Sequence, residues 1–254
     1  MIKKVIVAAA GQGTRMLHLT NNKPKHLINV QQRPFLSYLL DNLFRAEYRD
    51  ITLVVGYKGE LVEEFIKQYT PPVGGEFKIK FISQYEILGP KEKEYGTACP
   101  LKCVKEIVKD KSFIFLCGDN LYSVEDLKAM NVDDEYSYVA GLEHDHPEKY
   151  GVLITDNGFL KEIKEKPKEF YGNLINAGMY KFTPDVFEKI SQIKKSPRGE
   201  YEITDVISLL AKNKKVKVIK IKDYWLDFGN PGDIIKLSKF IKNGSRKAGA
   251  KYSK

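Results

Sequence analysis

Residues 4–16 read KVIVAAAGQGTRM, an apolar run that leads directly into a glycine-rich loop. Val5, Ile6 and Val7 are β-branched and predict a buried strand. The alanines and glycines that follow keep side-chain bulk away from the backbone, so the N–H groups of the loop can face an anion such as a phosphate. An ordinary strand-to-helix turn is the alternative interpretation, because two glycines at this spacing are common.

Three cations near the loop favour the phosphate-binding interpretation. Arg15 follows the loop directly, and Lys23 and Lys25 flank Pro24 a few residues later. An arginine fork and two lysine charges can converge on one polyanion. The spacing is not that of a P-loop, which requires Gly-Lys-Ser/Thr, and no acidic residue follows at the distance typical of a dinucleotide-binding unit.

The composition is typical of one globular domain. Of 254 residues, 43% are hydrophobic and 30% are charged, and no apolar stretch is long enough to span a membrane. We expect a single domain over residues 1–242, followed by a flexible basic tail over residues 243–254. No hexapeptide repeat follows residue 242, so we expect no β-helical extension. The net charge of +9 favours anionic partners, which composition leaves open between nucleic acids and small phosphates.

Cysteine usage indicates a reducing compartment. Cys99, Cys103 and Cys117 are odd in number and have no pairing framework, so we expect a cytoplasmic protein. Two thiols at positions 99 and 103, without nearby His or Cys partners, are more typical of a packed core than of a metal site. His144 and His146 are expected in a polar loop.

Strand and helix patterns alternate through the first half of the chain. The periodicity predicts strands at residues 4–7, 27–30, 51–56, 77–82 and 112–117, and helices at residues 35–48 and 61–69. A further strand is predicted at residues 216–221. This order predicts an α/β fold in which right-handed crossovers join parallel strands and place helices on both faces of the sheet.

Two aspartates follow strands of this sheet, and functional sites of such sheets lie at the carboxyl ends of strands. Asp119 comes after the apolar run 112–117, and Asp227 lies in an aromatic stretch after the strand 216–221. An aspartate at a strand end also caps turns, and for Asp119 alone the two interpretations are equally favoured. Mg²⁺ takes one or two carboxylates together with phosphate oxygens and water, so the pair predicts a magnesium site beside the phosphate loop.

A series of short motifs follows in order along the chain. They are Gly11-x-Gly13-Thr14-Arg15, Pro24-Lys25, Gly118-Asp119-Asn120, Tyr150-Gly151-Val152, Glu165-Lys166-Pro167, Asn176-Ala177-Gly178, Arg198-Gly199-Glu200-Tyr201-Glu202-Ile203-Thr204-Asp205 and Trp225-Leu226-Asp227. The series resembles the sugar-1-phosphate nucleotidylyltransferase family over about residues 2–242, most of all its glucose-1-phosphate thymidylyl- and uridylyltransferases. The resemblance implies the nucleotidyltransferase fold, a Rossmann-like mixed, mostly parallel sheet flanked by helices.

The resemblance also implies roles for individual residues. Arg15, Lys25 and Asp119 match catalytic positions, and Asp119 and Asp227 match the Mg²⁺ ligands. The positions that match nucleotide-binding residues are Ala10, Gly11, Gly13, Thr14, Arg15, Gln84, Gly96 and Thr97. Those that match sugar-phosphate-binding residues are Gly151, Glu165, Lys166 and Asn176. Without the resemblance, Glu165 and Lys166 are more typical of a solvated charged run.

The implied reaction joins a nucleoside triphosphate to a sugar 1-phosphate and releases pyrophosphate. It needs no protein nucleophile, because the sugar phosphate itself attacks the α-phosphorus. We expect UTP or dTTP and glucose 1-phosphate as substrates and Mg²⁺ as cofactor. Neither nucleic acid nor a membrane is expected as a partner, and a homo-oligomer is left open.

The nucleotide base is the least determined of these expectations. The Gln84 amide both donates and accepts hydrogen bonds, which suits uracil or thymine. Residues 175–180 also resemble mannose-1-phosphate guanylyltransferases, which use GTP, and the segment 84–97 is longer than usual where the base is read. Two alternatives belong to other classes: a basic nucleic-acid-binding protein, whose retention on DNA or RNA would fall steeply with salt, and a phosphosugar sensor, which would lack the metal carboxylates.

Overall fold

The computed structural model of the chain describes residues 1–244, so the predicted tail lies outside the described residues from residue 245 onward. The strands are β1 (Lys4–Ala9), β2 (Asn29–Val30), β3 (Arg33–Pro34), β4 (Asp50–Val55), β5 (Lys78–Ser83), β6 (Phe113–Cys117), β7 (Asn120–Tyr122), β8 (Ser137–Glu143), β9 (Gly151–Asp156), β10 (Phe159–Glu165), β11 (Leu174–Phe182), β12 (Val216–Lys220) and β13 (Trp225–Asp227). The α-helices are α1 (Phe35–Arg45), α2 (Gly59–Gln68), α3 (Gln84–Leu88), α4 (Cys99–Lys102), α5 (Lys105–Val108), α6 (Val124–Ala129), α7 (Val186–Ile190), α8 (Ile203–Ala211) and α9 (Pro231–Lys242). Three short 3₁₀ helices are η1 (Thr14–Thr20), η2 (Lys25–Leu27) and η3 (Pro147–Lys149).

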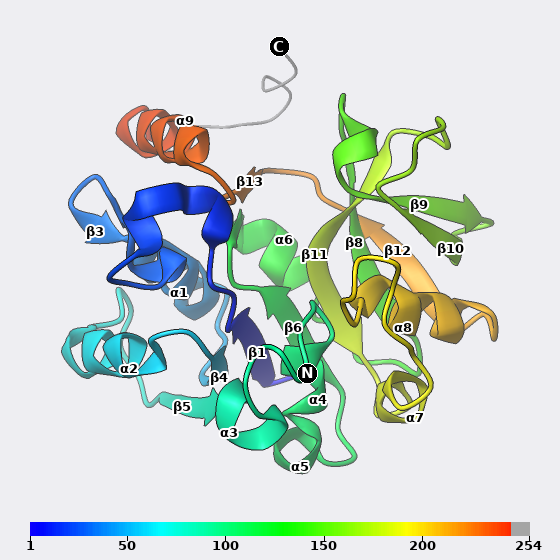
Figure 1. The fold of residues 1–254 in the computed structure, drawn as a ribbon, viewed down its shortest axis with the longest axis horizontal. Helices are drawn as coiled ribbons and strands as arrows, with labels where there is room; N and C mark the ends of the chain where they lie inside the picture. The colour runs from blue at the N-terminus through cyan, green and yellow to red at the C-terminus, as the bar shows by residue number, and fades with distance from the viewer. Residues whose placement is uncertain (245–254) are drawn as a thin grey trace.

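Within residues 1–244, nine strands form one sheet in the order β5-β4-β1-β6-β11-β8-β12-β10-β9. The first four strands are parallel, and we call them the parallel half. Strand β11 runs antiparallel to both β6 and β8, and it begins the curled half, which runs from β11 to β9. We call it curled because Val152 of β9 also pairs with Ile175 of β11, so the two end strands of this half meet. Figure 1 shows the two halves side by side.

Strands β4, β1 and β6 of the parallel half are buried on both faces because they are apolar at successive positions. Val5 and Val7 belong to the apolar cluster under α1, whereas Ile6 belongs to the cluster that includes α4 and α8. All three side chains are fully buried. Successive side chains of a strand point to opposite faces, so β1 is held between two cores and its carboxyl end has a defined position.

The predicted α/β fold is confirmed, and the predicted elements of the parallel half agree with the structure to within a few residues. Two differences are local. The strand predicted at residues 27–30 is reduced to β2, because residues 25–27 form η2, and α1 ends at Arg45 rather than at residue 48. The parallel arrangement is confined to one half of the sheet and to the β8–β12 pair, since the β9–β10 hairpin and β11 introduce antiparallel neighbours.

The thiols at positions 99 and 103 are buried and unpaired, as predicted for core residues. His144 and His146 lie between β8 and η3, outside the regular elements, as predicted. Across residues 1–244, no helix combines the length and the apolar character that crossing a bilayer requires.

Candidate active site

The glycine-rich loop connects β1 to η1 and lies against the side chain of Lys25. Gly13 has a φ of 69°, in the left-handed region that glycine adopts without strain. A Cβ atom on Gly13 would lie 2.9 Å from the Cβ of Lys25, and one on Gly11 would lie 4.0 Å from its Cε. The second glycine is therefore required both by the turn and by the lysine that packs over it.

Lys25 forms an ion pair with Asp119, which follows β6. Gly118, the residue before Asp119, packs closely against β1. Its N–H donates to the Ala8 carbonyl at 2.9 Å, and a Cβ on Gly118 would lie 2.6 Å from the same oxygen. Burial opposes ionisation of the Asp119 carboxyl, but the charge and hydrogen bond of Lys25 outweigh it and lower its pKa. Burial lowers the pKa of neighbouring His26 to about 3, so this imidazole is neutral and does not compete for the carboxylate.

Asp227 comes to the same place from the other end of the chain. Strand β13 pairs with β7 so that Asp227 lies opposite Asn120, and the Phe228 N–H donates to the Asp119 carbonyl at 2.8 Å. Burial, and then the charge of Asp119, raises the pKa of Asp227 to about 7. Within residues 1–244, no hydrogen bond or ion pair engages the Asp227 carboxylate.

This pair of carboxylates fits a hard divalent cation. The Asp119 carboxyl is ionised, and burial and the charge of Asp119 disfavour ionisation of Asp227. A cation held by both carboxylates would favour the ionised form of Asp227. Oxygen ligands of this kind suit Mg²⁺, which keeps further positions for phosphate oxygens and water. Asp119 and Asp227 are thus the residues that would hold the metal.

The curled half supplies the residues predicted for the sugar phosphate. Glu165, at the end of β10, pairs in register with Gly151, where a Cβ would lie 3.1 Å from the Glu165 Oε2. Burial raises the pKa of Glu165, although the Arg198 guanidinium at 3.6 Å opposes the shift. Lys166 adopts a left-handed φ of 44° and its N–H donates to the Tyr150 carbonyl at 2.9 Å.

Asn176 lies in a bulge of β11, and its amide is used within that bulge. The Nδ2 donates to the Tyr180 hydroxyl at 2.8 Å, and the Oδ1 accepts from the Gly178 N–H at 3.0 Å. The bulge turns the Ala177 carbonyl toward Trp225, whose Nε1 donates to it at 2.9 Å. Asn176 therefore shapes the wall of the site as well as lining it.

A cleft of about 190 Å³ joins these groups. The predicted nucleotide and metal residues in its wall are Arg15, Thr97, Asp119 and Asp227. The predicted sugar-phosphate residues Gly151, Glu165, Lys166 and Asn176 all line it as well. The other predicted residues do not line this cleft: Ala10, Gly11, Gly13, Thr14, Lys25, Gln84 and Gly96. Of these, Lys25 is connected to the cleft through its ion pair with Asp119.

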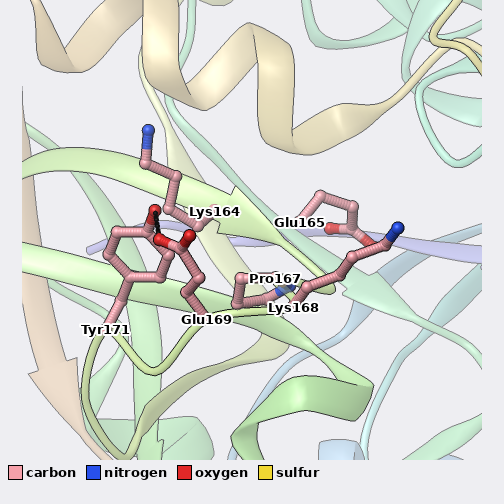
Figure 2. A pocket seen from close by; sticks show the side chains of 6 residues that line it. All are labelled: Lys164, Glu165, Pro167, Lys168, Glu169 and Tyr171. Atoms are coloured by element: carbon pink, nitrogen blue, oxygen red, sulfur yellow. Dashed lines mark hydrogen bonds between the residues drawn. The ribbon is translucent and has the colours of Figure 1, made fainter.

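A second hollow of about 300 Å³ is lined by the end of β10, including Glu165, and by the connection that follows β10 in the chain. Figure 2 shows Tyr171 and Glu169 on one side of it and Glu165 with Lys168 on the other. The Tyr171 hydroxyl donates to Glu169 at 3.1 Å. The hollow contains neither aspartate of the carboxylate pair, so the cleft remains the candidate site.

The sequence profile of the nucleotidyl transferase family matches residues 4–244. The chain belongs to this family. The UTP–glucose-1-phosphate uridylyltransferase AglF of Haloferax volcanii is 33% identical over 91% of this chain and 93% of its own length. The bifunctional protein GlmU of Methanocaldococcus jannaschii is 37% identical over 93% of this chain and 53% of its own length. The chain thus spans about half the length of such bifunctional relatives.

Solved structures support the same family and fold. A candidate glucose-1-phosphate thymidylyltransferase from Bacillus anthracis, in complex with a sucrose, superimposes with a TM-score of 0.74 at 26% identity, covering 94% of this chain and 95% of that one. A UDP-glucose pyrophosphorylase complexed with UDP-glucose gives a TM-score of 0.81 at 23% identity, covering 96% and 99%, and shows the likeness of fold alone. The predicted family and its nucleotidyltransferase fold are therefore confirmed.

Gln84, predicted to contact the base, is the first residue of α3 and is almost fully buried. Its Oε1 is buried and has no hydrogen-bond partner among residues 1–244. A buried amide oxygen that lacks a partner is costly, because it has lost its hydrogen bonds to water.

Sequence reasoning did not select Lys149, Tyr150 and Trp225 as site residues, although all three line the cleft. It also did not select Glu202, which is buried and accepts hydrogen bonds from Arg198 at 2.8 Å and from Ser196 at 2.9 Å. The available signal was the motif series, because Tyr150, Trp225 and Glu202 each belong to one of its members.

Proposed function

We propose that the chain transfers a nucleoside monophosphate from a triphosphate to a sugar 1-phosphate. The observation that carries the proposal is the single cleft, which joins the carboxylate pair and Arg15 of one side to Glu165, Lys166 and Asn176 of the other. Such an arrangement suits two anionic substrates whose phosphates must meet. The family membership supports the same activity.

In this reaction an oxygen of the sugar phosphate forms a bond to the α-phosphorus of the triphosphate. The bond from that phosphorus to its bridging oxygen breaks, and pyrophosphate leaves with the electron pair. Arg15 and Lys166 reduce the repulsion between the two anions, and Lys25 keeps Asp119 ionised and oriented. Mg²⁺, when bound by Asp119 and Asp227, would supply further neutralisation of phosphate charge.

We propose UTP or dTTP as the nucleotide and glucose 1-phosphate as the sugar. The uridylyltransferase name of the Haloferax volcanii relative and the unpaired oxygen of Gln84 support a pyrimidine with an N3–H donor. A mismatched base would leave buried polar groups unpaired, which discriminates strongly. A guanylyltransferase that uses GTP is the alternative.

The first test is pyrophosphate release by the purified chain, with and without Mg²⁺, over a panel of UTP, dTTP, GTP, ATP and CTP with glucose 1-phosphate or mannose 1-phosphate. We expect turnover that depends on Mg²⁺ and is faster with UTP or dTTP than with the other nucleotides. Faster turnover with GTP than with both would replace the base assignment by the guanylyl alternative. Absence of release with every pair would refute the activity.

We also propose a domain organisation and a cellular location. Residues 1–242 are proposed to act as one domain, since the cleft is built from both halves of the sheet. A cytoplasmic location is proposed because the three cysteines are free thiols. The binding of nucleotide and sugar phosphate needs no other partner in this proposal.

A further inference from the structure

The segment Gly89–Gly96 lies in the connection between α3 and α4. Its end is firmly attached to the start of α8. The Tyr201 N–H donates to the Tyr95 carbonyl at 2.8 Å, and the Ala98 N–H donates to the Tyr201 carbonyl at 2.9 Å. A Cβ on Gly96, which has a φ of 134°, would lie 2.3 Å from the Tyr201 oxygen. Only glycine fits this close approach, so the segment is an ordered part of the site region.

The middle of the segment reaches the glycine-rich loop. The Lys91 Nζ donates to the Gln12 Oε1 at 3.0 Å, and Gln12 lies between Gly11 and Gly13. The same ammonium lies 4.6 Å from the centre of the Tyr95 ring. Lys91 is half-buried, and both groups that hold it are uncharged.

Lys91 differs in this respect from Glu94 of the same segment. Glu94 is neutralised by Lys102 at 2.7 Å. Among residues 1–244, by contrast, no carboxylate lies within 4.0 Å of the Lys91 Nζ. A positive charge that is positioned by neutral groups beside a phosphate-type loop remains available to an anion.

We propose that Lys91 is an additional phosphate-binding cation of the nucleotide site, delivered by the segment Gly89–Gly96. The inference rests on the proposed function, because the anion it assigns is the triphosphate of the nucleotide substrate. Lys25 packs against Gly11 and Gly13 of the loop, and Lys91 hydrogen-bonds to Gln12 between them. Two lysines therefore contact the glycine-rich loop.

The test is titration calorimetry of the full chain with UTP and with inorganic triphosphate, which has the phosphates but no base. Lys91→Met is expected to weaken both ligands by about tenfold, the effect of one charge-assisted hydrogen bond. Lys91→Gln should lose the same affinity, because it keeps a donor for Gln12 but not the charge. Lys91→Arg should recover most of it.

Lys93→Met is the matched control, because Lys93 is an exposed lysine of the same segment. It should leave both affinities within twofold of the wild type. The proposal is overturned if Lys91→Met also stays within twofold, if only UTP and not inorganic triphosphate is weakened, or if Lys91→Arg restores nothing. Melting temperatures of all variants show whether a loss reflects unfolding, and Lys91→Gln and Lys91→Arg keep the comparison valid if Lys91→Met is unstable.

The same titrations separate this inference from the proposed function. If the wild type binds inorganic triphosphate but releases no pyrophosphate with any substrate pair, the proposed function fails and the variants still decide the role of Lys91. If the wild type binds neither ligand, both are refuted. If transfer is observed while Lys91→Met binds normally, only the inference about Lys91 is refuted.

Discussion

At the level of single residues, the carboxylate pair is the most informative feature of the cleft. Asp227→Asn removes the proposed Mg²⁺ ligand with little change in volume, and within residues 1–244 the carboxylate has no hydrogen bond or ion pair that the substitution would break. We expect turnover to fall at least about a hundredfold at saturating Mg²⁺, because in such reactions the metal stabilises the charge of the transition state by several kcal/mol. Steady-state kinetics and circular dichroism together measure the loss and check the fold.

Asp119→Asn is the companion variant, and it should differ in one respect. Turnover should fall as much, but stability should also fall, since Lys25 loses its buried counter-ion. Asp156→Asn, in a residue outside the cleft, serves as the control and should behave as the wild type. Turnover like that of the wild type in Asp227→Asn would remove this residue from the site.

At the level of secondary structure elements, β11 contains a buried charge that the periodicity of the sequence did not indicate. Lys181 is fully buried, and its Nζ donates to the Asp134 carbonyl at 2.6 Å, to the Asp134 Oδ1 at 3.2 Å and to the Tyr136 carbonyl. It thereby ties the loop before β8 to β11. We expect Lys181→Met to lower the free energy of unfolding by about 2–3 kcal/mol, because three acceptors lose their donor. Urea denaturation at pH 7 measures this.

The pH dependence gives this prediction a second measurement. Burial opposes ionisation of Asp134, but hydrogen bonds from Tyr138 and Lys181 lower its pKa below the ordinary value of 3.8. A carboxyl whose pKa is lowered by folding stabilises the protein above its unfolded pKa and loses that contribution as the pH falls through the folded pKa. The difference between wild type and Lys181→Met should therefore shrink below about pH 4. A difference that does not change with pH would mean that the ion pair is not its source.

At the level of the whole molecule, the two halves of the sheet contribute different ends of one cleft. Asp119 follows β6 of the parallel half, Glu165 is the last residue of β10 in the curled half, and both line the cleft. We expect Glu165→Ala to weaken glucose 1-phosphate binding by about tenfold to a hundredfold, because a carboxylate that accepts sugar hydroxyls contributes charge-assisted hydrogen bonds. The affinity for UTP should stay within twofold. Two binding titrations, one for each substrate, measure this separation.

Glu162→Ala is the matched control for this experiment. Glu162 lies on the same strand, but it is paired with Lys164 at 2.9 Å on the exposed side and does not line the cleft. It should change neither affinity. If Glu165→Ala weakens the binding of both substrates equally, or of neither, Glu165 belongs to a solvated charged run and not to the sugar-phosphate site.

The sequence alone determined the local part of this protein. Apolar periodicity predicts β1, α1, β4, α2, β5 and β6, because strand and helix periods are written in neighbouring residues. The glycine-rich turn is equally local, since the left-handed φ of Gly13 depends on one residue type. The motif series also contains residues from both ends of the cleft, among them Asp119 and Glu165, although other residues selected from it, such as Gly11 and Gly13, do not line the cleft.

Only the tertiary structure decided which of these residues meet. Lys25 and Asp119 are 94 positions apart, Asp227 joins them through a strand pairing, and Lys91 reaches Gln12 across 79 positions. The return of β9 to β11 is another such contact. These contacts follow from how whole elements pack, and the same packing sets the pKa values of Asp119 and Asp227. A pattern that extends over a few residues carries no information about a partner so distant in the chain.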